Sequence, residues 1–117
     1  MKNILLIDDH AVVREGIKSA LIQNNLHCVG EASSKGEALA QIANHNPDAI
    51  VVDLNLPDGN GLEIVSWARK ISQTIGIVVL TLHDSDQYLQ ASMQAGASAH
   101  ILKSAPVTEL IAAIEHS

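Results

Sequence analysis

The segment AIVVDLNLPDGNG occupies residues 49–61 and has two parts. Residues 49–52 are all apolar, and an acid, Asp53, follows them directly. Pro57, Gly59 and Gly61 come next, and residues of this kind so close together are typical of a loop. A short apolar run that stops at a loop is typical of a strand buried on both faces. The segment therefore predicts a buried strand that carries Asp53 at its carboxyl end.

The rest of the chain repeats this alternation of apolar runs with helical patterns. Near the end, for example, Val107, Leu110, Ile111 and Ile114 recur at helical spacing. We expect strands at residues 4–7, 27–32, 49–52, 77–80 and 101–102. We expect helices over residues 13–21, 39–43, 62–68, 84–95 and 107–114. Ser34 is the predicted N-cap of the second helix, and Gly96 is the predicted C-cap of the fourth. Five such pairs predict an α/β fold, (βα)5, with a doubly wound parallel five-stranded sheet covered on both faces.

Composition argues against several classes of protein. The chain has 117 residues, 47% of them hydrophobic and 2% aromatic, which predicts one domain, residues 1–117, with an aliphatic core. A net charge of −6 and the lack of a basic run argue against direct binding of nucleic acid or of an anionic membrane by this segment. The apolar run at residues 4–7 is too short for a signal peptide, so a cytoplasmic location is expected. Cys28 is the one cysteine, which excludes an internal disulfide and predicts a buried, inert thiol.

Polar residues follow four of the predicted strands. Asp8 and Asp9 come after the first strand, Asp53 after the third, Thr81 after the fourth and Lys103 after the fifth. Ligands of an open parallel sheet bind at the carboxyl ends of its strands, so we expect these side chains to converge. Carboxylates repel one another unless positive charge lies among them. Lys103 supplies one such charge, and Mg²⁺, which prefers oxygen ligands, would supply two more.

This set of groups suits phosphoryl transfer. A carboxylate held beside Mg²⁺ can attack a phosphorus centre, while the metal ion, Lys103 and the Thr81 hydroxyl offset the charge of the phosphoryl oxygens. The reaction depends mainly on positioning and electrostatics, so a site without a general base can carry it. His10 could act as a base or a metal ligand, but we favour a surface or loop-shaping role beside the site.

The same residues resemble a known family. Ile7–Asp9, Val52–Gly61, Leu80–Thr81 and Leu102–Lys103 follow one another as in the receiver domain of two-component response regulators, and the resemblance covers nearly the whole chain. Residues 8–16, DDHAVVREG, further resemble regulators with a helix-turn-helix DNA-binding output, the NarL/FixJ/LuxR-like group. The resemblance implies a flavodoxin-like sheet with strand order 2-1-3-4-5.

The resemblance also implies a role for each residue of the site. Asp53 would be the phosphoacceptor. Asp9 would bind Mg²⁺ directly and Asp8 through water, and the backbone carbonyl of Asn55 would complete the protein's share of the metal shell. Lys103 would pair with the phosphoryl group, and Thr81 would hydrogen-bond it and move toward it.

Two departures from the family pattern concern switching. In relatives, a Tyr or Phe ring three residues before Lys103 swings inward when Thr81 moves, and here the residue is His100. A histidine can titrate near neutral pH, so it would make the coupling pH-sensitive, or it would be an exposed edge-strand residue with no switching role. Ser104 replaces a common proline, which makes a cis peptide after Lys103 less expected. Asn55 and His83 lie two residues after Asp53 and Thr81, at positions that influence phosphoryl lifetime in the family.

The implied function is a signalling switch. A sensor histidine kinase or a small acyl phosphate would donate the phosphoryl group, and the chain would catalyse only its own phosphorylation and dephosphorylation, so it would be no enzyme on other molecules. The expected readout surface is the fourth helix, fifth strand and fifth helix, residues 84–95, 98–102 and 107–114. A C-terminal DNA-binding domain beyond this chain would control transcription, and a homodimer would be compatible with that output.

Other interpretations stay open at this point. A pseudo-receiver would keep the fold and bind a partner without phosphate. A small phosphohydrolase would need a second acid where the chain has Asn55, and a flavin-binding electron carrier would need a Ser/Thr/Gly-rich loop at residues 8–10. Asp8 or Asp9 could also cap the first helix. Leu89 and Met93 are expected in the core.

Overall fold

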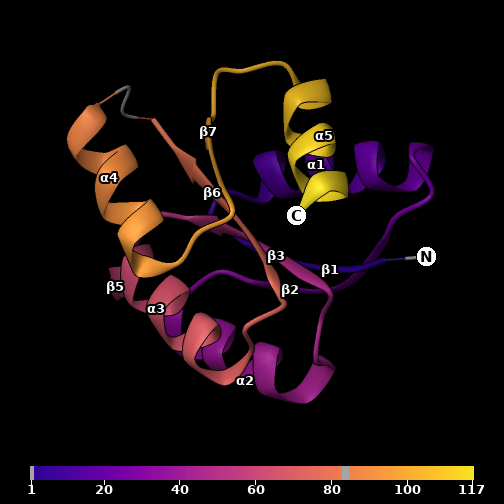
Figure 1. Cartoon of the computed structure of the whole chain (residues 1–117). Helices are drawn as coiled ribbons and strands as arrows, with labels where there is room; N and C mark the ends of the chain where they lie inside the picture. The colour runs from indigo at the N-terminus through magenta and orange to yellow at the C-terminus, as the bar shows by residue number, and fades with distance from the viewer. Residues whose placement is uncertain (1, 83–84) are drawn as a thin grey trace.

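Five parallel strands form the central sheet of the computed structural model, which describes residues 2–82 and 85–117. They are β1 (Asn3–Ile7), β2 (His27–Ala32), β3 (Ala49–Asp53), β6 (Gly76–Thr81) and β7 (Ala99–Leu102). Their order across the sheet is β2-β1-β3-β6-β7 (Figure 1). This is the predicted 2-1-3-4-5 order, because β4 and β5 lie outside this sheet.

Helices cover both faces of the sheet. They are α1 (Ala11–Gln23), α2 (Lys35–His45), α3 (Gly61–Ile71), α4 (Asp86–Ala95) and α5 (Val107–His116). In Figure 1, α1 and α5 lie together on one face, and α2 and α3 lie on the other, with α4 beside α3. Both predicted caps are confirmed: the Ser34 hydroxyl accepts the Glu37 N–H at 3.2 Å, and Gly96 ends α4 with φ of 116°. Residue 84 of the predicted fourth helix lies outside the described residues.

The strands have no polar alternation because both of their faces are buried. In β1, Leu5 and Ile7 pack into the core under α2 and α3, whereas Ile4 and Leu6 pack into the core under α1 and α5. Full burial of one such side chain contributes roughly 1.5–3 kcal/mol to stability. A parallel sheet between two helical layers therefore accounts for the apolar runs.

The expected core positions of Leu89 and Met93 are wrong. Leu89 is 41% exposed and Met93 is 45% exposed, and the one buried residue of α4 is Ser92. The helix packs against α3 and against β7, the last strand of the sheet. Leu89 and Met93 therefore lie on the side of α4 that faces solvent.

The loop after β3 is a tight hairpin that leads straight into α3. The short strands β4 (Asn55–Leu56) and β5 (Gly59–Asn60) pair antiparallel, and the Asn60 side chain caps α3 by accepting the Leu62 N–H at 2.9 Å. Gly61 begins α3 so close to β3 that a Cβ atom would collide with the backbone of Asp53 and Leu54. Glycine therefore permits α3 to start directly behind the phosphoacceptor candidate.

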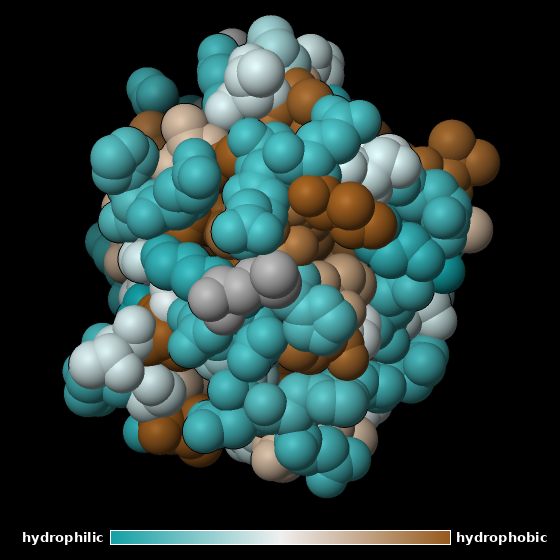
Figure 2. Space-filling view, turned by 90° about the vertical axis from the view of Figure 1, so that its right-hand side faces the viewer, coloured by the Kyte–Doolittle hydropathy of each residue, from teal (hydrophilic) through white to brown (hydrophobic). Residues whose placement is uncertain are grey.

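The surface is mainly hydrophilic on the side shown in Figure 2, with apolar side chains in patches between the polar ones. Two strongly exposed apolar side chains, Val12 at 85% and Ile22 at 74%, both belong to α1. Within the described residues, no helix is long and apolar enough to cross a membrane. No peptide bond in that part of the chain is cis, including the one after Lys103.

Candidate functional site

Asp53 ends the central strand β3, and only 1% of its surface is exposed. Its Oδ1 atom accepts the backbone N–H of Asn55 at 3.0 Å, and its Oδ2 atom accepts the Lys103 ammonium group at 3.0 Å. Burial raises the pKa of Asp53 above its ordinary value, and the Asp8 carboxylate acts in the same direction. The Asn55 N–H and the Lys103 ammonium offset that rise only in part.

Asp8 and Asp9 form the turn between β1 and α1. Asp8 is 1% exposed, and its Oδ1 atom accepts the backbone N–H of His10 at 2.8 Å. Neither acid is the N-cap of α1, because His10 occupies that position and no side chain caps the helix. Both carboxylates are therefore available at the sheet edge, with the side chain of Asp9 31% exposed.

Lys103 lies between the two buried acids. Its ammonium nitrogen is 3.0 Å from Asp8 Oδ2 and 3.0 Å from Asp53 Oδ2, and its side chain is 10% exposed. Burial by itself would lower the pKa of Lys103, but the hydrogen bonds to Asp53 and Asp8 outweigh that effect and hold the pKa above its ordinary value. The lysine is therefore a permanent cation beside both carboxylates.

Thr81 reaches the same edge from β6. It is the last residue of that strand and is fully buried. Its backbone carbonyl accepts the N–H of Lys103 at 2.8 Å, and Thr81 pairs with Leu102 of β7. The backbone of Lys103 is therefore tied directly to the strand that carries the threonine.

The acids at this edge fit a divalent cation. One ligand atom from each of Asp8, Asp9, His10 and Asp53 lies within 4.8 Å of all the others. The buried Asp8 Oδ2 has the Lys103 ammonium nitrogen beside it at 3.0 Å. A divalent cation would add positive charge to an edge that holds three carboxylates and this one ammonium group. Carboxylate oxygens are the ligands that Mg²⁺ or a similar hard ion prefers.

The His10 side chain contacts both acids of the turn. Its Nδ1 atom is 3.0 Å from Asp8 Oδ1, 3.2 Å from Asp9 Oδ1 and 3.3 Å from the Lys103 ammonium nitrogen, and its side chain is 56% exposed. The expected place of His10 beside the site is confirmed.

His100 is turned toward α4. It is half-buried in β7, and its Nδ1 atom lies 3.0 Å from the hydroxyl of the buried Ser92, which donates its proton to the carbonyl of Leu89 at 2.9 Å. His100 is therefore not an exposed edge-strand residue, and its contact with Ser92 links β7 to α4. The position of His83 lies outside the described residues.

Arg14 was not among the residues expected at the site, but the structure places it next to the acid pair. One of its terminal nitrogens donates to the backbone carbonyl of Asp8. The signal available in the sequence was an arginine in the first turns of the helix that follows the acid pair. Its partner across the sheet, Glu31, is seventeen residues further along the chain, so the contact depends on how β2 lies beside β1.

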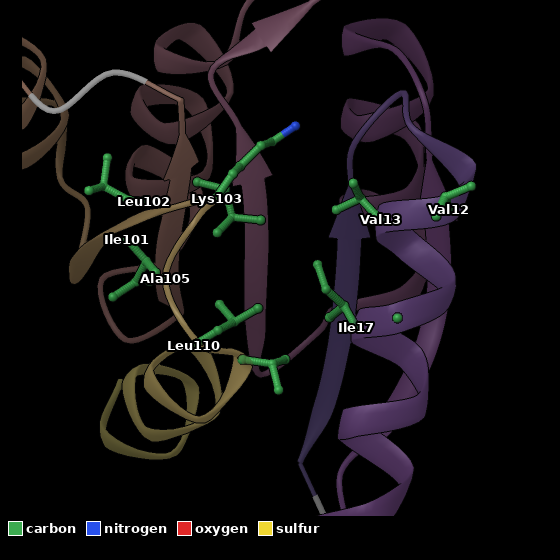
Figure 3. A pocket seen from close by; sticks show the side chains of 11 residues that line it. Val12, Val13, Ile17, Ile101, Leu102, Lys103, Ala105 and Leu110 are labelled. Carbon is green, nitrogen blue, oxygen red and sulfur yellow. The ribbon is translucent and has the colours of Figure 1, made fainter.

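An apolar groove of about 370 Å³ lies between α1 and α5, next to the site. In Figure 3, Val13 and Ile17 of α1 face Leu110 of α5 across it. Lys103 borders the groove with its stem, and its ammonium group points away, toward the carboxyl ends of the strands (Figure 3). Apart from Lys103, the lining residues carry no charge, so the chemistry is confined to the sheet edge.

Comparison with known proteins identifies the family. The model of the response regulator receiver domain family matches residues 4–115. The chain belongs to this family. Its receiver fold carries the two acids after β1, the acid that ends β3, the threonine that ends β6 and the lysine after β7 at one edge of the sheet.

Similar proteins place this receiver domain among NarL/LuxR-type response regulators. The DNA-binding transcriptional activator DevR/DosR of Mycobacterium tuberculosis is 36% identical over 116 residues, which cover 98% of this chain and 54% of that protein. The structure of a LuxR-family two-component response regulator from Aurantimonas sp. SI85-9A1 is 33% identical, has a TM-score of 0.93, and aligns over 99% of this chain and 84% of that one. The receiver domain spans about half the length of the curated relatives it matches.

A further solved structure is of a phosphorylated response regulator. It is a response regulator from Burkholderia pseudomallei with a phosphorylated aspartic acid, a calcium ion and citrate. It is 29% identical to this receiver domain, with a TM-score of 0.89, and the alignment covers 97% of this chain and 66% of that one.

Proposed function

We propose that this receiver domain is a phosphorylation-dependent switch in which Asp53 accepts a phosphoryl group with the help of Mg²⁺. The observation that carries the proposal is the buried position of Asp53 at the end of β3, with Oδ2 3.0 Å from the Lys103 ammonium nitrogen and with Asp8 and Asp9 beside it. The relative from Burkholderia pseudomallei supports it, because that protein carries a phosphorylated aspartic acid and a divalent cation.

The transfer needs an ionised Asp53. One of its oxygens forms a bond to the phosphorus atom of a phosphohistidine on a sensor kinase, or of a small acyl phosphate. The bond from phosphorus to the donor's nitrogen or oxygen breaks, and the imidazole or carboxylate leaves with the electron pair. Lys103 stays beside the incoming oxygens and the Thr81 hydroxyl offers a further donor, so the charge of the transition state is offset.

The acids after β1 would hold the metal ion. Asp8, Asp9 and Asp53 supply the carboxylates, and Asn55 is fixed nearby by its bond to Asp53. When bound, Mg²⁺ would supply positive charge against the phosphoryl oxygens. Apart from the phosphoryl donor, the domain would act on no other molecule and would catalyse its own phosphorylation and dephosphorylation only.

The proposed output surface is formed by α4, β7 and α5. A phosphoryl group adds a charge of about −1.5 to −2 next to Thr81 and Lys103. Thr81 is paired with Leu102 of β7, so a shift of the threonine would be passed to β7 and, through the bond between His100 and Ser92, to α4. In a longer cytoplasmic regulator this surface would control a DNA-binding domain and hence transcription, as the name of DevR/DosR describes for that relative.

The first test is phosphorylation of the domain by acetyl phosphate and Mg²⁺, followed by intact mass. We expect one phosphoryl adduct, lost when the metal ion is chelated and absent in Asp53→Asn. Asp58→Asn is the matched control, because Asp58 lies in the same loop but binds the backbone N–H groups of Lys35 and Gly36 instead of the site. With beryllofluoride, amide resonances of α4, β7 and α5 should shift.

The opposite result would favour a different class of function. If the domain gains no adduct and beryllofluoride causes no shift, the phosphoryl switch is refuted. The pseudo-receiver would then be the better account, with the fold binding a partner without phosphate.

A further inference from the structure

The guanidinium group of Arg14 joins three parts of the chain next to the acid pair. It belongs to α1, and its side chain is 18% exposed. One terminal nitrogen donates to the backbone carbonyl of Asp8, and Nε donates to Glu31 Oε1 of β2 at 3.0 Å. The planar guanidinium group makes these two bonds from separate nitrogens held in a fixed geometry, whereas a lysine offers a single nitrogen without that fork.

Glu31 holds this guanidinium in place. Its second oxygen accepts the Lys18 ammonium group at 2.9 Å. The hydrogen bond from Lys18, together with the one from Arg14, outweighs partial burial and lowers the pKa of Glu31 below its ordinary value. Glu31 is therefore ionised at neutral pH and remains a strong acceptor for Arg14.

The result is a turn whose backbone is held on both sides. The N–H of Asp8 donates to the carbonyl of Ala32 in β2 at 2.9 Å, and its carbonyl accepts from Arg14. That carbonyl belongs to the peptide that links Asp8 to Asp9. These bonds therefore restrain the backbone from which both carboxylates extend.

We propose that Arg14 is a positioning residue for the divalent cation, acting through the Asp8 carbonyl and held by Glu31. The inference rests on the proposed function, because it concerns the same cation. Arg14 forms no ion pair with either carboxylate of the turn in the described structure, so it does not compete for their oxygens.

Two effects of removing Arg14 have opposite signs. Loss of a positive charge near the acids would by itself tighten cation binding. Loss of the bond to Asp8 would loosen the turn. Removal of a group that orients metal ligands typically weakens metal affinity about 10–100-fold. The direction of the change therefore separates positioning from simple charge.

The test is a Mg²⁺ titration of the 117-residue chain, followed by the amide resonances of residues 8–10. Arg14→Met keeps a long side chain and a good helix former, and we expect it to raise the Kd for Mg²⁺ about tenfold. Arg14→Lys restores the charge without the fork, so its Kd should stay raised. Lys18→Met is the matched control: it removes the same charge and a bond to Glu31 but not the bond to Asp8, and its Kd should change less than about twofold.

Each outcome has a defined meaning. Unchanged or tighter Mg²⁺ binding by Arg14→Met, or an equal loss in Lys18→Met, overturns the positioning role. Should Arg14→Met fail to fold, Glu31→Gln leaves the arginine in place with a weaker hold, and an unchanged Kd in that variant overturns the inference as well. If the unaltered chain itself does not bind Mg²⁺, the proposed function fails and the inference fails with it.

Discussion

At the scale of single residues, the burial that places Asp53 at the site also disfavours its charged form. Asp53 and Asp8 are buried side by side, and Lys103 is the cation that contacts both of them in the described structure. Burial raises the pKa of Asp53, so the ionised form that phosphoryl transfer needs is the form that the fold tolerates least. A site of this kind is expected to lower the free energy of unfolding when no metal ion is bound.

Asp53→Asn is therefore expected to raise the Tm at neutral pH without Mg²⁺. A folded pKa above the unfolded value means that the contribution of Asp53 to stability is fully present below the unfolded pKa of about 3.9, and is lost as the pH rises through the folded pKa. Asparagine carries no charge, so the gain should appear at neutral pH and vanish under acid conditions. Thermal melts at both pH values measure this difference.

Asp58→Asn is the control with the opposite sign. The backbone N–H groups of Lys35 and Gly36 lower the pKa of Asp58, with the bond to Lys35 the larger influence. A lowered folded pKa gives stability above the unfolded pKa that is lost as the pH falls, so this substitution should lower the Tm at neutral pH. Equal shifts in the two variants would contradict the role of burial at Asp53.

At the scale of elements, the position of the phosphoacceptor candidate depends on how closely α3 approaches β3. The hairpin of β4 and β5 returns the chain to the end of β3. There the Gly61 N–H donates to the Leu54 carbonyl at 3.0 Å. There is no room for a side chain at Gly61, whereas a Cβ atom at Gly16 in α1 would meet nothing within 4 Å. The two glycines therefore have different reasons for being there.

Gly61→Ala should destabilise the domain by about 1–3 kcal/mol, because the methyl group would force the backbone of Asp53 and Leu54 to move. Gly16→Ala should stabilise it by roughly 0.5–1 kcal/mol, since alanine is the better helix former and the space is open. Denaturant unfolding of both variants measures the two free energies. A stable Gly61→Ala variant that is phosphorylated at the normal rate would show that α3 can move away at little cost.

At the scale of the whole molecule, the site exists only in the folded chain. Its acids and its lysine lie at residues 8, 9, 53 and 103, and they meet because β1, β3, β6 and β7 are neighbours in one parallel sheet. The unfolded chain has no comparable cluster. A ligand that binds only the folded state stabilises that state by mass action.

Mg²⁺ should therefore raise the Tm of the whole domain. At a concentration one hundred times its Kd, a ligand of the folded state adds about 2.7 kcal/mol to the free energy of unfolding. Thermal melts with MgCl₂, compared with NaCl at equal ionic strength, separate binding from screening. The gain should be smaller in Asp53→Asn, which lacks one of the carboxylates, and an equal gain with NaCl would argue against a specific site.

The fold and the residues at the strand ends could be derived from the sequence because their signals are local. Apolar runs such as residues 49–52 mark buried strands, helical spacing marks the helices, and a parallel sheet puts all its carboxyl ends at one edge. Family resemblance added the strand order and the roles of the site residues. The tertiary structure decided three things: the exposure of Leu89 and Met93, the bond between His100 and Ser92, and the link from Arg14 to Glu31 and Asp8. Each depends on which elements lie side by side in space. Hydrophobic periodicity along the chain predicts the elements but not which of them are neighbours.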